Sequence, residues 1–261
     1  MAARLAQRNL VVLARPTSDI SVLPPDVEVV RGDLGGKLPL DGVTTLVYCA
    51  SMGFGHVPPL VQQLESAGVQ RAVFLSTTAI FTGLPSTSRQ VRVDAESAVA
   101  QSTLNWTIVR PTMIYGTGRD RNISRLLRFL KRWPVFPLCG NALWQPVHVE
   151  DLADAVVAAL ESPASVRKTY NVAGAAPLRF ASLVHAAARA VGRRVTLIPV
   201  PIGAAVVAAR LTRVVTAEQV RRLAEDKAFD YEDATRDLGF APRSFEEGVR
   251  LEARSLGLRS A

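Results

Sequence analysis

Short apolar runs alternate along the chain with segments whose apolar residues recur at helical spacing. The runs are rich in β-branched residues and bounded by turn residues, and they predict strands at 9–14, 27–31, 44–49, 72–76, 107–110 and 169–172. Helices are predicted between them at 56–67, 93–102 and 151–161. Because strands that alternate with helices form parallel βαβ units, the pattern predicts a doubly wound α/β sheet.

The pattern changes after Tyr115. A basic amphipathic stretch at 119–132 leads into a loop rich in Pro and Trp, and short helices with one strand near 195–200 are predicted beyond Gly174. We therefore expect two lobes. The sheet domain occupies 1–115 plus about 146–174, and a smaller, mainly helical lobe occupies 116–145 plus 175–261.

The composition is that of an ordinary globular protein with a basic surface. The 261 residues carry 31 basic and 23 acidic side chains, a formal net charge of +8. The arginines are scattered and do not interleave with aromatic residues, so we expect solvated faces and no nucleic-acid partner. The alternative is a surface that binds nucleic acid or phosphate. The two cysteines, Cys49 and Cys139, are too few for a disulfide framework or a four-cysteine metal site. We expect no metal, no membrane-spanning helix and a cytoplasmic location.

Four segments, taken in order, carry a family pattern. They read VVRGDL at 29–34, FLSTTAIF at 74–81, WTIVRPTMIYG at 106–116 and VHVEDLA at 147–153. In order and spacing they resemble the extended and atypical short-chain dehydrogenase/reductase superfamily, in its NAD-dependent epimerase/dehydratase branch. The resemblance covers roughly residues 9–200. It implies a Rossmann-type dinucleotide-binding domain and a substrate lobe that serves nucleotide sugars or other small carbonyl compounds.

The resemblance also implies which residues meet the cofactor. They follow the predicted strands and are Asp33, Leu34, Cys49, Ala50, Ser51, Pro111, Thr112 and Met113. Asp33 would face the adenine, and its alternative role is to stabilise its own turn. Arg15 stands where an acidic residue would bond a ribose 2′-hydroxyl, and an Arg there pairs with a 2′-phosphate. We therefore expect NADP as the cofactor, with NAD as the alternative. The other interpretation of Arg15 is that it is an ordinary solvated arginine.

The chain departs from the family pattern at the phosphate-binding turn. No Gly-x-Gly-x-x-Gly sequence is present, and the turn that begins at Gly53 runs into Pro58. The first eight residues resemble the end of a crossover helix. We expect the family's first strand, its glycine-rich turn and part of its first helix to be missing, through a misplaced start codon or a natural truncation.

The second departure concerns the catalytic residues. Members with standard activity carry a Tyr-x-x-x-Lys pair, in which the Lys lowers the pKa of the Tyr. No Tyr in this chain is followed by Lys at that spacing, and the family positions fall on Ser88 and Arg92. Thr77 is the remaining catalytic candidate, because its hydroxyl could polarise a carbonyl. Closing the end of a strand is its alternative role.

Three residues are candidates for contact with a substrate. Tyr115 is expected at the mouth of the cleft, with Arg119 and His148 nearby; the alternatives are a packing role for Tyr115 and a structural role for His148 at a helix start.

We interpret the chain as an NAD(P)-binding oxidoreductase or isomerase for a nucleotide sugar or small carbonyl compound. The alternative is a catalytically inactive dinucleotide-binding scaffold or accessory subunit. Whether it catalyses anything stays open, and an exposed sheet edge would make a homo-oligomer or a partner subunit plausible.

Overall fold

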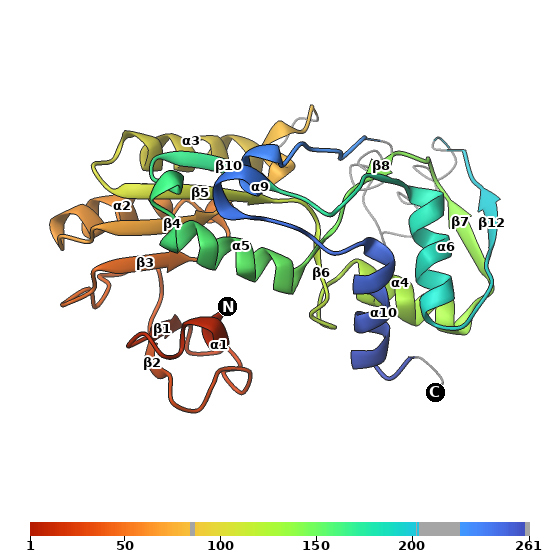
Figure 1. Cartoon of the computed structure of the whole chain (residues 1–261), viewed down its shortest axis with the longest axis horizontal. Helices are drawn as coiled ribbons and strands as arrows, with labels where there is room; N and C mark the ends of the chain where they lie inside the picture. Colours follow the sequence, from red (N-terminus) through yellow and green to blue (C-terminus); the bar gives the residue numbers. More distant parts are fainter. Residues whose placement is uncertain (84–86, 202, 204–224, 259–261) are drawn as a thin grey trace.

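A four-stranded parallel sheet forms the centre of the molecule (Figure 1). The computed structural model describes residues 1–83, 87–201, 203 and 225–258. The sheet has the order β10-β5-β4-β3, and every neighbouring pair is parallel. Its strands are β3 (Thr45–Tyr48), β4 (Arg71–Leu75), β5 (Asn105–Pro111) and β10 (Lys168–Val172). The predicted α/β fold class and these four predicted strands are confirmed.

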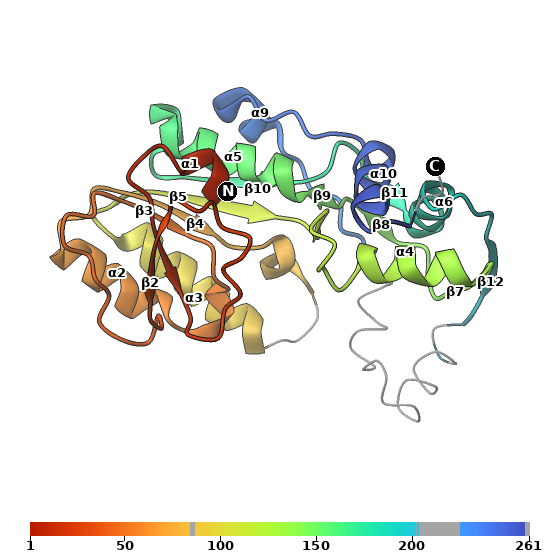
Figure 2. The same ribbon diagram turned by 90° about the horizontal axis from the view of Figure 1, so that it is seen from below.

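Helices cover both faces of this sheet (Figures 1 and 2). On one face, α2 (Val57–Ser66) and α3 (Thr87–Gln101) enclose an apolar cluster that includes Leu60, Val99 and Phe74. On the other face, α5 (Val149–Glu161) and α9 (Glu232–Leu238) pack with Val156, Tyr170 and Ala234. The α9 segment falls within the predicted smaller lobe, yet it packs on α5 and β10 of the sheet domain.

Helix α3 begins six residues before the predicted start. Residues 88–92 are polar apart from Val91 and all are exposed or half-buried, so they carry no apolar periodicity that could predict a helix. The predicted helices at 56–67 and 151–161 agree with α2 and α5 to within two residues at each end. Short 3₁₀ helices follow two of the strands and one helix: η1 (Met52–Phe54), η2 (Thr78–Phe81) and η3 (Pro163–Ser165).

The first two predicted strands form a parallel pair of their own. β1 (Val11–Ala14) bonds β2 (Glu28–Arg31) and no strand of the four-stranded sheet within the described ranges. The pair lies beside β3 and runs across the direction of the sheet (Figures 1 and 2). Helix α1 (Ala2–Leu5) and the turn after it are held to α5 by the ion pairs Arg4–Asp154 and Arg8–Glu161.

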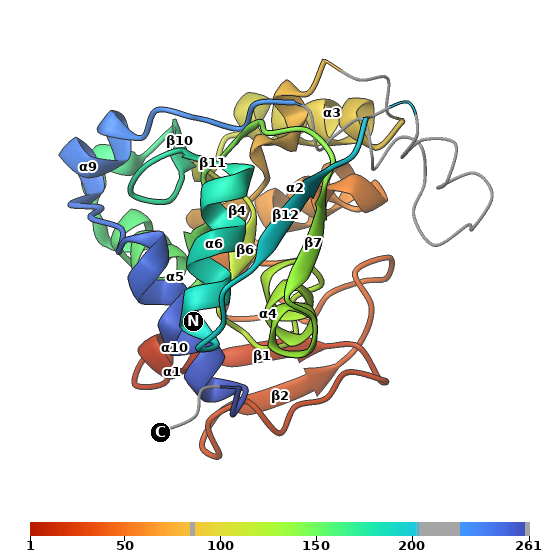
Figure 3. The same cartoon turned by 90° about the vertical axis from the view of Figure 1, so that its right-hand side faces the viewer.

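The smaller lobe is built around three helices (Figure 3). These are α4 (Ile123–Arg132), α6 (Phe180–Ala190) and α10 (Phe245–Ser255), whose apolar sides share one cluster. Short strands pair around them: β6 (Ile114–Tyr115) with β9 (Val147–His148), β7 (Val135–Leu138) with β12 (Thr196–Pro199), and β8 (Leu143–Trp144) with β11 (Leu178–Arg179). The predicted strand near 195–200 is confirmed.

Within the described part of the chain, no helix combines the length and apolar character that crossing a membrane requires.

The two lobes meet at Tyr115. Its ring lies 5.3 Å from the ring of His148 and 5.3 Å from that of Phe245, measured between centroids. Helix α10 passes so close that a Cβ added to Gly248 would lie well inside contact distance of the Tyr115 hydroxyl oxygen. A glycine at this position of α10 therefore permits the close approach of helix and tyrosine.

We expect Gly248→Ala to lower the free energy of unfolding by about 1–3 kcal/mol, as overpacking in a core does, although Ala is the better helix former. Removing the hydroxyl with Tyr115→Phe in the same chain should recover part of that loss, because the hydroxyl is the nearest atom. Urea unfolding measures both changes. Gly36→Ala is the control, since its nearest neighbour would lie at 3.8 Å. A Gly248→Ala variant as stable as the native chain would contradict this packing.

Candidate functional site

The sequence-predicted site residues follow the carboxyl ends of the strands. Cys49 comes directly after β3, Thr77 lies two residues after β4, and Pro111 ends β5. Because β3, β4 and β5 are parallel, these ends lie along one edge of the sheet, the edge that faces the smaller lobe (Figure 1). The structure thus brings Cys49, Thr77 and Pro111 to one side of the sheet domain.

Ser88 and Arg92, the positions predicted for the family's Tyr and Lys, both lie on α3 and are hydrogen-bonded to each other. The Arg92 Nη1 donates to the Ser88 hydroxyl oxygen at 3.0 Å and to the Ser88 carbonyl oxygen at 3.2 Å. The same guanidinium lies over η1, where a Cβ on Gly53 would be 3.3 Å from it. Arg92 therefore joins α3 to the segment that follows β3.

The Thr77 hydroxyl serves the turn after β4. It accepts a hydrogen bond from the Ala79 N–H at 3.2 Å and thereby begins η2. The neighbouring Thr78 hydroxyl donates to the Pro111 carbonyl oxygen at 3.3 Å. These bonds correspond to the strand-closing role that the sequence left open for Thr77.

An ion pair behind this edge was not predicted from the sequence. The Arg110 Nε lies 3.1 Å from both carboxylate oxygens of Glu96, and both side chains are largely buried. The Arg110 guanidinium also lies 5.1 Å from the centroid of the Phe81 ring. This pair ties α3 to β5 and supports η2. Glu96 follows Ser88 and Arg92 on α3 at helical spacing. The sequence could not predict that it pairs with Arg110, because Arg110 belongs to a separate strand.

The segment that returns from the smaller lobe closes over η2. The Glu225 carboxylate accepts hydrogen bonds from the Thr82 hydroxyl at 2.8 and 2.9 Å and from the Gly83 N–H at 2.9 Å. Farther along, the Phe229 and Phe81 rings lie 5.8 Å apart. Sequence reasoning did not single out Glu225, which is about 140 residues distant from its partners and stands in no motif.

Two of the three residues that were candidates for substrate contact are buried. Tyr115 was expected at the mouth of a cleft, but its side chain is only 1% exposed, because α10 and His148 cover it. His148 is also buried, and its Nδ1 accepts the Glu150 N–H at 3.3 Å at the start of α5. The expectation for Tyr115 is therefore corrected, and His148 has the helix-capping role. Arg119 is exposed and pairs with Asp19 at 3.1 Å.

Arg15, Asp33 and Leu34, which were expected near the adenosine part of the cofactor, lie just after the two strands of the β1–β2 pair. The Asp33 carboxylate accepts the Gly35 N–H at 3.3 Å, which is the local turn role considered for it. Arg15 is exposed, and its carbonyl oxygen accepts a hydrogen bond from the Arg31 Nη1 at 2.8 Å. Leu34 packs against the same apolar cluster as Ala50, so the pair is anchored to the sheet domain through side chains.

A dinucleotide needs a cradle of N–H groups for its pyrophosphate, and the nearest candidate does not supply one. Helix α2 follows the glycines at 53 and 55, but Pro58 and Pro59 in its first turn have no N–H to donate. The Gly53 N–H already donates to the Ser51 hydroxyl at 3.2 Å, and Arg92 lies over Gly53. The residues that the structure describes after β3 do not fit the pyrophosphate of NAD or NADP.

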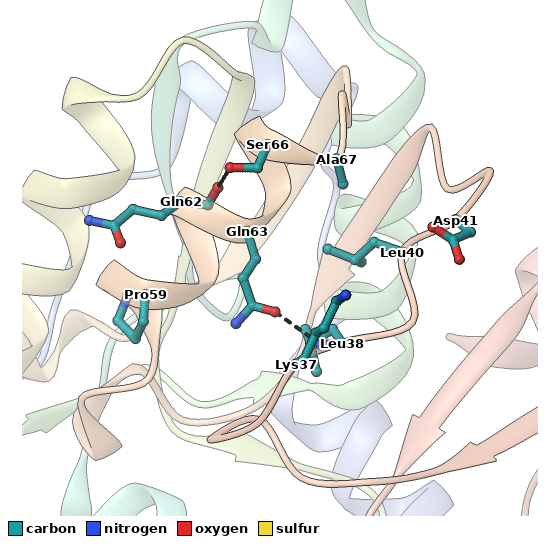
Figure 4. A pocket seen from close by; sticks show the side chains of 9 residues that line it. All are labelled: Lys37, Leu38, Leu40, Asp41, Pro59, Gln62, Gln63, Ser66 and Ala67. Carbon is teal, nitrogen blue, oxygen red and sulfur yellow. Dashed lines mark hydrogen bonds between the residues drawn. The ribbon is translucent and has the colours of Figure 1, made fainter.

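A hollow of about 520 Å³ lies elsewhere on the sheet domain. It is formed by the segment 37–41 and by α2, and Gln63 spans it by accepting the Leu38 N–H at 2.9 Å (Figure 4). None of the residues predicted to meet a cofactor or substrate lines it. This hollow therefore belongs to the outer side of α2 and not to the edge of strand ends.

A pair of carboxyl groups lies in the interior of the smaller lobe. Glu252 on α10 is 1% exposed and accepts the Gly118 N–H at 3.0 Å. Burial and the hydrogen bond with Asp120 raise the pKa of Glu252 to about 8. Burial acts to raise the pKa of Asp120 too, but the proton of Glu252 and the N–H groups at the start of α4 outweigh it and hold that pKa low. One proton between the two groups satisfies the oxygens that have no other partner among the described residues.

Comparison with known families gives a match in the centre of the chain. The model of the NAD dependent epimerase/dehydratase family matches residues 89–173. Among curated relatives, subunit 9 of the NADH dehydrogenase [ubiquinone] 1 alpha subcomplex, mitochondrial, from Arabidopsis thaliana is 34% identical over 113 residues, 42% of this chain and 28% of that protein. The chain thus spans less than a third of that relative. A UDP-glucose 4-epimerase from Vibrio cholerae is 23% identical and is matched over 84% of this chain and 78% of that protein.

Solved structures share the fold over nearly the whole chain. UDP-glucose 4-epimerase from Thermus thermophilus, solved as a complex with NAD, superposes with a TM-score of 0.76 at 19% identity and covers 98% of this chain and 94% of that one. MoeE5 in complex with UDP-glucose and NAD gives a TM-score of 0.74 at 18% identity, with coverages of 97% and 94%. At these identities the likeness concerns the fold.

The pKa of Glu252 leads to a prediction about stability and pH. Because the folded chain holds this carboxyl protonated well above the pH at which an unfolded Glu ionises, its contribution to stability falls as the pH rises from about 5 to about 8. Glu252→Gln keeps a hydrogen-bonding group of the same shape that does not titrate. We therefore expect the thermal unfolding temperature to fall with pH more steeply in the native chain than in Glu252→Gln. The control is Glu247→Gln, at an exposed position of the same helix. Equal slopes in the native chain and Glu252→Gln would refute the shared proton.

Proposed function

We propose that this chain is a non-catalytic accessory member of the NAD-dependent epimerase/dehydratase family, whose model matches residues 89–173. The match to the family model confirms the resemblance found in the sequence. One observation carries the proposal. At the two positions where the family's proton-transfer pair stands, this chain has Ser88 and Arg92, and they are hydrogen-bonded to each other at 3.0 Å.

The chemistry of these two side chains does not support proton transfer near neutral pH. A serine hydroxyl is a far weaker acid than a tyrosine, and Arg92 is a permanently charged planar group where the family has a compact ammonium. Losing a general acid costs roughly 10²- to 10⁴-fold in rate. The third candidate, Thr77, already uses its hydroxyl oxygen in the turn at Ala79.

The cofactor gives a second, independent support. The family uses NAD, but in this chain the first turn of α2 is blocked as a phosphate cradle by Pro58 and Pro59. Within the described residues, the turn between β3 and α2 therefore supplies no N–H cradle for a pyrophosphate. The preference for NADP over NAD rests on Arg15 alone and stays a prediction.

A role within an assembly agrees with the edges of the sheets. The β1–β2 pair, which lies beside the outer strand β3, bonds no further strand among the described residues, and Val11 on β1 is 46% exposed. Unpaired strand edges of this kind are templates for pairing with another chain. The Arabidopsis relative is by its name a subunit of a larger enzyme, which supports a partner subunit for this chain as well. A homo-oligomer is the other form that such pairing can take.

An active nucleotide-sugar epimerase or dehydratase is the second candidate. The Vibrio cholerae relative favours it, because that epimerase aligns with most of this chain. The parallel arrangement of the strand ends that bear Cys49, Thr77 and Pro111 is also the one on which such a site is built. In this case the partner would be a small substrate, a nucleotide sugar or another carbonyl compound.

We expect the purified chain to show no saturable change in NADPH or NADH fluorescence, and no conversion of UDP-glucose or UDP-glucuronic acid with NAD⁺, because the phosphate cradle and the proton-transfer pair are absent from the described site. The measurement is a fluorescence titration followed by a product assay. Circular dichroism confirms that the sample is folded.

Variants on α3 decide between the two candidates if turnover is found. Turnover that Ser88→Ala or Arg92→Gln abolishes, and that Ser97→Ala at an exposed position of the same helix leaves unchanged, would establish an enzyme and overturn the proposal. Saturable NADPH binding without turnover would overturn only the conclusion about the phosphate cradle.

A further inference from the structure

The far end of the smaller lobe carries exposed apolar side chains. Val135 on β7 is 41% exposed, Ile198 on β12 is 50% exposed, and Trp133, directly after α4, is 52% exposed. In Figure 3 this end of the molecule faces the viewer, and β7 and β12 cross its front. Exposed apolar side chains that gather on one face mark interaction sites more often than single ones do.

The strand register places these side chains on one face. In the parallel pair, Val135 lies opposite Thr196, and Pro137 lies opposite Ile198. Alternate residues of a strand share a face, so these four point to the same side, and all four are exposed. Phe136 and Leu197 point the other way and pack in the apolar cluster of the lobe. The outer side of the β7–β12 pair is therefore a small apolar surface turned away from the core.

The chain segments that form this surface contain basic residues and no acidic ones. Residues 121–149 contain five Arg and Lys and no Asp or Glu, and residues 162–217 contain eight Arg and Lys and no Asp or Glu. Within the described part of these stretches, the three arginines that precede the two strands, Arg132, Arg193 and Arg194, are all exposed.

The parallel register brings those arginines together. Arg132 precedes β7 by three residues, and Arg193 and Arg194 precede β12 by two or three. The Thr196 N–H donates to the Pro134 carbonyl oxygen at 2.8 Å, so the two chain segments enter the strands side by side. Arg132 also lies 5.6 Å from the centroid of the Trp133 ring. One end of the apolar surface is thus a basic cluster that includes an aromatic ring.

We propose that this surface, formed by the outer side of the β7–β12 pair together with Trp133 and the arginines at 132, 193 and 194, docks the protein on an anionic lipid bilayer. The aliphatic side chains enter the boundary between headgroups and acyl chains, and Trp133 lies at that boundary as interfacial tryptophans do. The guanidinium groups bind lipid phosphates, and their aliphatic stems extend from the apolar surface.

The aliphatic character of the surface favours lipid over nucleic acid. Val135, Pro137 and Ile198 neither stack on bases nor donate hydrogen bonds to them, whereas they gain free energy on leaving water for the bilayer interface. Single-stranded nucleic acid would instead call for aromatic platforms along a basic groove. The proposal uses neither nucleotide binding nor catalysis, so it stands or falls apart from the accessory role proposed above.

Vesicle sedimentation of the full chain tests the proposal. We expect binding to vesicles of phosphatidylcholine mixed with phosphatidylglycerol, little binding to phosphatidylcholine alone, and a blue shift of tryptophan emission on binding that Trp133→Phe removes. Arg132→Gln/Arg193→Gln should weaken binding by about fivefold for each charge removed. Val135→Ser/Ile198→Ser, which keeps every charge, should weaken it as well and reduce the blue shift.

Matched controls lie on other surfaces of the molecule. Lys37→Gln/Arg254→Gln removes two exposed charges elsewhere, and Val22→Ser removes an apolar side chain that is 65% exposed. Both controls should bind vesicles as the native chain does. Absence of binding to the anionic vesicles overturns the proposal, and so does an equal loss in the controls. Binding to a single-stranded RNA that Val135→Ser/Ile198→Ser leaves unchanged, with none to vesicles, would assign the surface to nucleic acid instead.

Discussion

Parallel pairing of β3, β4, β5 and β10 is the constraint on which the rest of the structure depends. Parallel strands require a crossover after each strand, so α2, α3 and α5 must lie on the two faces of the sheet. The same pairing puts all four carboxyl ends at one edge, which is why the loops at Cys49, Thr77 and Pro111 lie on one side. The smaller lobe is joined at this edge through Tyr115, so the family's site position and the contact between lobes share the same few turns.

Polar side chains at that edge satisfy one another. Ser88 bonds Arg92, Thr77 bonds the N–H of Ala79, and Glu96 pairs with Arg110. These hydrogen bonds begin η2 and hold α3 against its neighbours. A fold of this kind can be kept while the groups at its site change.

The smaller lobe has a different surface chemistry from the sheet domain. Its long stretches without Asp or Glu leave the guanidinium groups uncompensated along the chain, and its outer strand pair exposes aliphatic side chains beside them. Such a surface can place a protein whether or not it catalyses a reaction. On the proposals above, the unpaired edges of the β1–β2 pair would meet a partner chain, and the basic apolar face of the smaller lobe would meet a membrane surface. The junction at Tyr115 and Gly248 joins the two lobes.

The local pattern of the sequence determined the strands of the sheet, the helices α2 and α5, and the family resemblance, because periodicity and turn residues act over a few neighbours. The absence of a Tyr-x-x-x-Lys pair was also visible there, because it depends only on spacing along the chain. The assignment of the two positions to Ser88 and Arg92 stays a prediction. Tertiary structure alone decided the rest. It buried Tyr115 under α10, turned β1 and β2 across the sheet, and paired Glu96 with Arg110, Glu225 with Thr82 and Glu252 with Asp120. Those outcomes join residues from separate elements, and no local pattern records which elements will meet.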